Sequence, residues 1–249
     1  MKTGQPLIAL LILILGSISC SPIWLRFSGV LEEEPELKVL SNAEKEVLFL
    51  PIHHIGRESY YRAVKRISDS LDQQAYTILY EQVSTDLREV EDFVVMAKKF
   101  RKLTGSFDAG TGYLDTVNHK IGSMHYNPKY QLMNQPDLVG LGIDTATAIK
   151  ADLLLEDLIL AFEKKNGTIQ LDSCDLDTDL ESDYLCSASN ADWQKDFRKN
   201  FILGLRNENL ARHIDQSESE KIFVIYGASH FKGLKKELSH LNLEWTELK

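Results

Sequence analysis

Three apolar runs constrain the fold of this chain more than any other feature of its sequence. They read EVLFLPI at residues 46–52, YTILY at residues 76–80 and KIFVIYG at residues 221–227. Continuous apolar runs of this length are typical of strands that are covered on both faces, as in parallel sheets. Two of the runs lie near the N-terminus and one near the C-terminus, so the two ends of the chain are expected to meet in one sheet.

Helical periods follow the first two runs. Residues 57–74 repeat apolar side chains every three or four positions, which predicts a helix directly after the first strand. Residues 86–103 show a second such period, and the side chains expected to face inward there are Leu87, Val90, Val94 and Ala97. A strand, a helix, a strand and a helix in this order imply a parallel pair with a right-handed crossover.

The second half of the chain is predicted to be mostly helical before it returns to the sheet. Residues 145–167 form one helical pattern, and residues 190–216 form a longer one with Asn190 or Asp192 as its N-cap. The third apolar run, a helix from about Lys232 and a short last strand complete the chain. These elements predict an α/β fold, with a mostly parallel or mixed central sheet built from the two ends of the chain and a helical insert between them.

Composition supports a single domain in an acidic protein. The chain has 249 residues, of which 43% are hydrophobic, and this is enough to bury one sizeable core. Its formal net charge of −9 argues against nucleic acid as a partner, because phosphates attract basic surfaces. Residues 21–46 are acidic and contain a proline, so we interpret them as a tether or irregular lead-in to a domain that spans residues 47–249.

The first 20 residues have the layout of a secretory signal peptide. Lys2 precedes an apolar segment, residues 7–15, and small residues follow it up to Cys20. The sequence SISC resembles a bacterial lipobox, in which Cys20 would be the lipidated first residue of the mature chain. A plain cleaved signal and an uncleaved anchor are the alternatives. All three place the domain outside the cytoplasm, and the lipobox indicates a bacterial cell envelope with the membrane bound through a lipid or an N-terminal anchor.

The two remaining cysteines, Cys174 and Cys186, lie in an acidic, loop-like segment. An oxidising compartment would allow them to pair, and we expect a disulfide between them rather than two free thiols. A zinc site is not indicated, since the segment lacks the paired spacing that such sites use.

Each of the three apolar runs ends in a polar group that could do chemistry. His54 follows the first run, Glu81 the second and His230 the third. Because the carboxyl ends of parallel strands form the crevice where ligands bind, these three side chains are expected to converge. Two histidines and a carboxylate are the ligand set of many catalytic metal sites, which predicts a divalent metal such as Mn, Zn or Co.

The same residues carry a resemblance to a known family. Gly227-Ala228-Ser229-His230, Glu81 at the end of TILYE, and Arg206-Asn207 on a helix stand in the order found in the TraB/GumN family. That family is related to the Tiki peptidases, the erythromycin esterases and the haem-binding ChaN lipoproteins. The family's first motif, Gly-x-x-His, departs here: Pro51 replaces the glycine in Pro51-Ile52-His53-His54. By register the family's histidine is His54, and His53 is the alternative.

The resemblance implies an exported, membrane-tethered hydrolase that acts on a peptide bond, or on an ester by analogy with the esterase branch. His54, Glu81 and His230 would hold the metal or share the role of general base with it. Arg206 lies at helical spacing with Leu203 and Leu210, so it is expected to be buried against a carboxylate or an anionic substrate or intermediate. As a catalytic group it would stabilise a developing oxyanion.

Two other functions are open at this stage. A lipoprotein of the ChaN type would bind haem or another small ligand in the same crevice without turnover, and Tyr61 could then coordinate the haem iron. The second alternative is a signal-modulating surface protein with a vestigial crevice, and the feature that favours it is Pro51 in place of glycine.

Overall fold

The computed structural model describes residues 25, 27–107, 114–122, 124–241 and 244–248. The predicted signal peptide and Cys20 lie outside these residues. Within them, no helix is long and apolar enough to cross a membrane.

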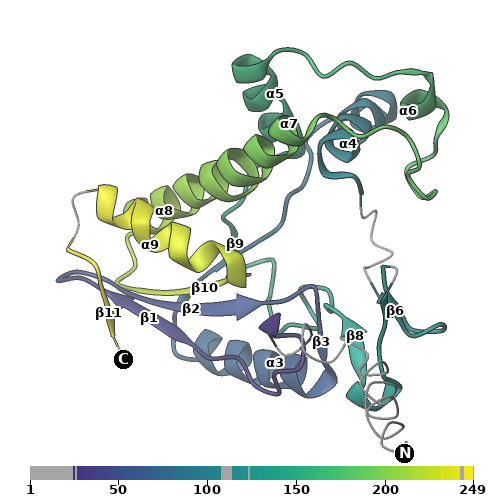
Figure 1. Cartoon of the computed structure of the whole chain (residues 1–249). Helices are drawn as coiled ribbons and strands as arrows, with labels where there is room; N and C mark the ends of the chain where they lie inside the picture. Colours follow the sequence, from purple (N-terminus) through teal and green to yellow (C-terminus); the bar gives the residue numbers. More distant parts are fainter. Residues whose placement is uncertain (1–24, 26, 108–113, 123, 242–243, 249) are drawn as a thin grey trace, which may run out of the picture.

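A six-stranded mixed sheet forms the centre of the molecule, with the strand order β11-β1-β2-β10-β4-β9 (Figure 1). Its strands are β1 (Lys38–Ser41), β2 (Glu46–Ile52), β4 (Thr77–Tyr80), β9 (Ile149–Lys150), β10 (Lys221–Gly227) and β11 (Thr246–Leu248). Strands β2, β10, β4 and β9 are parallel, and β1 and β11 extend the sheet in antiparallel fashion. The predicted α/β fold, with a sheet closed by the two ends of the chain, is confirmed.

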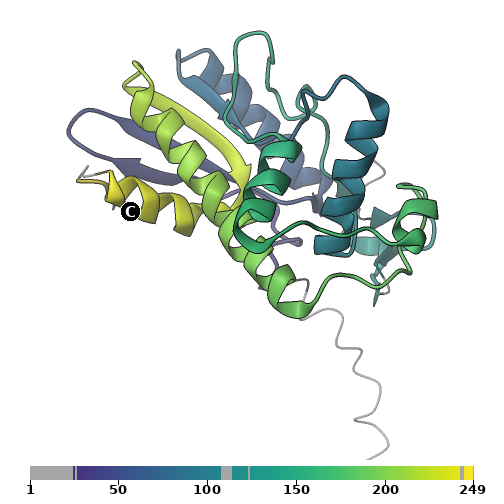
Figure 2. The ribbon, with the colours of Figure 1, turned by 90° about the horizontal axis from the view of Figure 1, so that it is seen from above.

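Helices cover both faces of this sheet, as the view from above also shows (Figure 2). One face packs against α3 (Glu58–Asp72), through a cluster that includes Tyr60 and Val64. The opposite face packs against α8 (Arg206–Gln216) and α9 (Phe231–His240), whose leucines meet the valines and phenylalanine of β2 and β10. Both faces of the central strands are therefore buried, which is why their sequences are apolar without alternation.

A helical lobe extends beyond the β9 side of the sheet. It contains α4 (Val90–Thr104), α5 (Leu155–Asn166), α6 (Ser173–Asp177), α7 (Ala191–Asp196) and the π-helix η3 (Phe197–Leu205). Phe100, Phe162, Phe197 and Phe201 contact one another edge-on or stacked in its core. The remaining short elements are β3 (Ile55–Arg57), β5 (Leu114–Asp115), β6 (Lys120–Ile121), β7 (Met124–His125), η2 (Pro128–Tyr130), β8 (Leu132–Asn134) and η4 (Ala228–His230).

The predicted disulfide is present and ties the acidic segment after α5 into a compact loop. Cys174 and Cys186 are bonded, with their Cα atoms 5.8 Å apart. The loop is fixed to α4 by Arg101, which is buried and donates hydrogen bonds to the carbonyl oxygens of Thr178 at 2.8 Å and Asp179 at 2.6 Å. An arginine in this position satisfies carbonyls that no helix or strand would satisfy.

Three local predictions differ from the structure. The helix predicted over residues 86–103 begins at Val90, so Leu87 precedes it and Val90 is 70% exposed, whereas Ala97 is buried as expected. The helix predicted over residues 145–167 begins only at Leu155, because Ile149–Lys150 pairs with β4 as strand β9. The lead-in over residues 21–46 includes strand β1, which covers an edge of β2 that would otherwise be unpaired.

The long helix predicted over residues 190–216 is confirmed as one continuous rod of α7, η3 and α8. The Asn190 side chain accepts a hydrogen bond from the Trp193 backbone N–H at 2.9 Å and caps its start. The sequence did not indicate that nine residues in its middle, η3, adopt the π form. Such widened turns are frequent at functional sites, and this one leads directly into Arg206.

Candidate active site

The carboxyl ends of four parallel strands meet at one edge of the sheet, and each is followed by a polar residue. His54 lies two residues beyond β2, Glu81 directly after β4, and His230 three residues beyond β10. The sequence also predicted these three positions. Strand β9 brings a fourth residue, Asp152, which was missed because its segment was assigned to a helix.

Glu81 is held at both carboxylate oxygens. Its Oε1 accepts a hydrogen bond from Nη2 of Arg206 at 2.5 Å, and its Oε2 accepts one from the backbone N–H of Gly227. A Cβ atom at residue 227 would lie 3.0 Å from Oε2, so the glycine allows the carboxylate to approach the backbone closely. The side chain of Glu81 is therefore fixed in one orientation with its charge paired.

Arg206 bridges two carboxylates inside the protein. Its Nε and Nη2 donate to the two oxygens of Asp152 at 2.8 and 2.7 Å, and Nη2 also donates to Glu81. Burial acts to lower the pKa of Arg206, but its hydrogen bonds to Asp152 and the charge of Glu81 outweigh this and raise it. The residue is only 6% exposed, so the predicted buried guanidinium is present, and a fork-shaped ion pair supports it.

His230 lies behind Glu81 as a neutral imidazole. It is 2% exposed, and burial lowers its pKa to about 4, although the charge of Glu81 opposes this. Its Nδ1 forms a 2.8 Å hydrogen bond with Oδ1 of Asn207, which makes Nδ1 the protonated nitrogen of the neutral ring. Nε2 then carries a lone pair, and it lies 3.8 Å from Oε1 of Glu81.

Asn207 is a second site residue whose exact role the sequence did not indicate. Its amide fits only because residue 233 on α9 is a glycine: a Cβ atom there would lie 2.0 Å from Nδ2 of Asn207. Asn207 itself is buried at the start of α8. The pair of Gly233 and Asn207 thus places the hydrogen-bond acceptor that selects the tautomer of His230.

The two adjacent histidines, His53 and His54, lie in different surroundings. His54 is exposed and lines the pocket beside Glu81, as the register of the resemblance implies. His53 turns the other way, against Gly29 and toward Glu32, whose carboxylate lies 3.9 Å from its Nε2. Burial lowers the pKa of His53. Tyr61 is buried, and its hydroxyl donates to the carbonyl oxygen of His53 at 2.6 Å, which leaves it directed away from the crevice.

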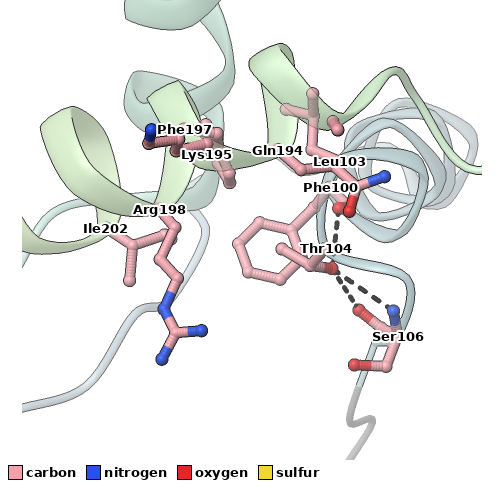
Figure 3. Close-up of a pocket in the computed structure, with 10 residues that line it drawn as sticks. Phe100, Leu103, Thr104, Ser106, Gln194, Lys195, Phe197, Arg198 and Ile202 are labelled. Atoms are coloured by element: carbon pink, nitrogen blue, oxygen red, sulfur yellow. Dashed lines mark hydrogen bonds between the residues drawn. The ribbon is translucent and has the colours of Figure 1, made fainter.

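These strand ends open into a pocket of about 620 Å³, which we call the strand-end pocket. Its polar wall carries His54, Glu81, Gln82, Ser84, Thr85, Gln135 and Arg206, and its apolar wall carries Val83, Phe93, Phe100, Phe107, Leu155 and Ile202. A second pocket of about 570 Å³ adjoins it and shares Phe100 and Ile202 as lining residues (Figure 3). The second pocket is lined from α4, α7 and η3, with Arg198 at its side.

The predicted metal ligands do not form a metal-binding group in this arrangement. Across the described part of the chain, no three His, Cys, Asp or Glu side chains are grouped so that they could hold a metal ion. Both oxygens of Glu81 already accept hydrogen bonds, and Nδ1 of His230 is engaged by Asn207. At this edge of the sheet the buried imidazole of His230 lies beside the carboxylate of Glu81.

No protein-family model, no curated protein and no solved structure matches this chain.

Proposed function

We propose that this protein is a hydrolase of a carbonyl bond, a peptide or an ester, with its reaction centre at Glu81 in the strand-end pocket. The observation that carries the proposal is the buried imidazole of His230, whose pKa is lowered, 3.8 Å behind the pocket-lining carboxylate of Glu81. A perturbed imidazole next to a specific charged partner in a concave site is the usual mark of acid–base chemistry. The order of the four motifs, which resembles the TraB/GumN family, supports the same class of reaction.

In this mechanism Glu81 takes a proton from a water molecule in the pocket. The resulting hydroxide attacks the carbonyl carbon of the substrate, and the carbonyl oxygen becomes an oxyanion. The lone pair on Nε2 of His230 then accepts a hydrogen bond from protonated Glu81, or accepts the proton itself. The 3.8 Å separation is longer than a hydrogen bond, so a bridging water or a small approach of the side chains completes the contact.

Arg206 and His54 have distinct roles in the same step. Arg206 holds Glu81 in place through their ion pair before the reaction, while Asp152 balances the charge of the arginine. His54 is exposed on the pocket wall and is the group placed to give a proton to the leaving group. The bond from the carbonyl carbon to the leaving group breaks, and the leaving group departs with the proton of His54 as a neutral amine or alcohol. The proton that Glu81 took from water then replaces the one that His54 gave, by exchange through solvent.

The room around the site suits an extended substrate. The strand-end pocket and the second pocket share Phe100 and Ile202 as a common wall, and further aromatic side chains line one pocket or the other: Phe93, Phe107 and Phe197. A peptide or an ester with an apolar body would place its reactive carbonyl near Glu81 and its remaining length along this wall.

The test is a hydrolysis screen with the full chain purified in detergent, on a panel of p-nitrophenyl esters and fluorogenic peptides. Glu81→Gln should lower kcat by at least about 100-fold, because it removes the proton acceptor in the reacting step. His230→Gln should lower kcat as well, and His54→Gln should lower it most for poor leaving groups. The matched control is His240→Gln, since His240 is exposed at the end of α9 and lines neither pocket. Equal activity of Glu81→Gln and the wild type would overturn the proposal.

The same screen tests whether the reaction requires a metal, as the resemblance implies. Activity that disappears with EDTA and returns with Mn²⁺, Zn²⁺ or Co²⁺ would establish a metal requirement, and the site would then have to rearrange to hold it. Activity that persists in EDTA supports the metal-free reaction. Binding of haem without any turnover would instead favour the ligand-binding alternative.

We also propose that the protein is exported and anchored in the bacterial cell envelope through Cys20. The disulfide supports an oxidising compartment. Cells fed with labelled palmitate should incorporate the label into the wild type but not into Cys20→Ala. An unlabelled wild-type chain would favour a plain cleaved signal or an uncleaved anchor.

A further inference from the structure

Ser84 is a polar residue of the strand-end pocket that the proposed reaction does not yet use. It lies in the loop after β4 and lines the pocket together with Glu81. Its backbone is fixed, because its carbonyl oxygen accepts a hydrogen bond from the N–H of Leu155 at 2.8 Å and it bridges to Leu154 in parallel fashion. Its side chain therefore has a defined place in the pocket.

The hydroxyl of Ser84 receives a hydrogen bond from a lysine. Nζ of Lys150, at the end of β9, lies 2.5 Å from Oγ of Ser84. The charge of Lys150 also acts on Glu156. Burial acts to raise the pKa of Glu156, but the hydrogen bond from the Asp86 N–H and the charge of Lys150 contribute to a net lowering. An ammonium group has only donors, so the lysine is the donor and Oγ of Ser84 is the acceptor.

The hydrogen-bonding capacity of the hydroxyl decides what Ser84 can offer to a ligand. A hydroxyl has one proton, and an ammonium group cannot accept it. Within the described residues, no side chain or carbonyl accepts a hydrogen bond from Oγ of Ser84. Its proton is therefore available to a ligand, and the cation behind it makes the hydroxyl a stronger donor.

Arg206 offers a second set of donors to the same pocket. Its Nε and Nη2 are engaged by Asp152 and Glu81, but no described residue accepts from Nη1. Arg206 lines the strand-end pocket, and Nη1 is the guanidinium nitrogen that these bonds do not use. The residue is 6% exposed, and its bonds to Asp152 and Glu81 fix the orientation of the guanidinium.

We propose that Ser84, with Lys150 behind it, and Nη1 of Arg206 form a binding site for the oxygen of a carboxyl or carbonyl group. In turnover this site would hold the carbonyl oxygen of the substrate and stabilise the oxyanion that forms on it. After turnover it would hold the carboxylate of the product. The inference rests on the proposed function, since it assigns the oxyanion site of the same pocket, but binding alone can test it. Ser84 would contact the ligand directly, and Lys150 would be a positioning residue.

The surrounding charges limit which ligands fit. Arg206 is shared between Asp152 and Glu81, and Lys150 lies near Glu156, so the negative charge of the set weakens the binding of a full anion without preventing it. An oxyanion that forms as Glu81 becomes protonated avoids this repulsion. The aromatic wall of the pocket favours a ligand whose oxygen is attached to an apolar body.

The test uses calorimetry with two probes, benzoate as a planar carboxylate and phenylphosphonate as a tetrahedral oxyanion mimic. Both should bind the full wild-type chain, and Ser84→Ala and Lys150→Met should each weaken binding by about tenfold or more, the size expected for a hydrogen bond to a charged group. Ser84→Thr keeps the hydroxyl and Lys150→Arg keeps the charge, so each should restore most of the affinity. Tighter binding of phenylphosphonate would assign the site to the oxyanion, and tighter binding of benzoate to the product.

Matched controls and a separate variant keep the two proposals apart. Ser70→Ala and Lys236→Met lie on exposed positions of α3 and α9 and should bind both probes as the wild type does. Glu81→Gln should bind them more tightly, because it removes the repelling charge, even though it is expected to abolish hydrolysis. No binding by the wild type, or equal binding by Ser84→Ala and Lys150→Met, would overturn this inference. If the wild type still hydrolysed substrates when this inference had failed, the proposed function would remain supported and only the oxyanion site would be wrong.

Discussion

At the scale of single residues, the site depends on charges that are buried in compensating sets. Arg206 lies between Asp152 and Glu81, and the side chain of Asp152 is fully buried. Such a set contributes little net stability, but removing one member leaves an unpaired charge in a medium that solvates it poorly. The residue that matters most is the arginine, because two carboxylates depend on it.

Arg206→Met should therefore destabilise the protein by about 3–5 kcal/mol, the cost of breaking a buried ion pair. Urea unfolding followed by circular dichroism measures this free energy. Arg212→Met is the matched control, because Arg212 lies on the same helix but is exposed, and we expect it to change stability by less than about 0.5 kcal/mol. Similar losses in both variants would contradict a special role for the buried set.

His230 makes stability depend on pH in a defined window. Its pKa is about 4 in the folded protein against an ordinary value of 6.5. Between these values the unfolded chain binds a proton that the folded protein does not, so stability falls as pH is lowered from about 6.5 to about 4. The loss reaches at most about 3 kcal/mol, since one pKa unit corresponds to about 1.4 kcal/mol.

Urea unfolding at several pH values would show this loss in the wild type and a smaller one in His230→Gln. His240→Gln, on an exposed position, should follow the wild type. Parallel curves for the wild type and His230→Gln would mean that another group causes the pH dependence.

At the scale of elements, the contact between α8 and α9 sets the geometry of the site. Asn207 begins α8, and Gly233 lies in α9 where any larger residue would clash with the asparagine amide. A glycine inside a helix usually costs stability relative to alanine, so its presence here has a steric reason.

Gly233→Ala should destabilise the protein by about 1–3 kcal/mol, as overpacking of a tight contact does. In the background of Asn207→Ala the same substitution should be neutral or stabilising, because the clash is gone and alanine favours the helix. Thermal unfolding of the four proteins in this cycle gives the coupling. Additive effects of the two changes would show that the contact does not limit the helix packing.

At the scale of the whole molecule, the helical lobe and the sheet both line the strand-end pocket. The sheet supplies the polar wall, while α4 and η3 supply Phe100 and Ile202. The disulfide loop is fixed to α4 by Arg101, so the far end of the lobe braces the apolar wall of the pocket.

Replacing both Cys174 and Cys186 by alanine should lower the free energy of unfolding by up to about 3 kcal/mol, as expected for a closed loop of this size. Urea unfolding of this double variant, compared with the wild type before and after reduction, measures the effect. Reduction should remove the difference, because the two proteins then lack the same bond. A variant as stable as the oxidised wild type would show that Arg101 holds the loop without help.

The sequence by itself determined the central sheet and three positions of the candidate site. Short apolar runs without alternation are typical of strands that are buried on both faces, and parallel strands bring their carboxyl ends to one edge. That reasoning was sufficient to place His54, Glu81 and His230 at one edge of the sheet, and the cysteine count predicted the disulfide.

Only the tertiary structure decided what these residues do with one another. Residues 149–152 look helical locally, but pairing with β4 outweighs this preference and delivers Asp152 to Arg206 and Lys150 to Ser84. The tautomer of His230 depends on Asn207, and Asn207 fits only beside Gly233, which is distant in the chain. Hydrogen bonds and close contacts between distant segments leave no periodic pattern in a sequence, because they are set by packing rather than by local backbone preference.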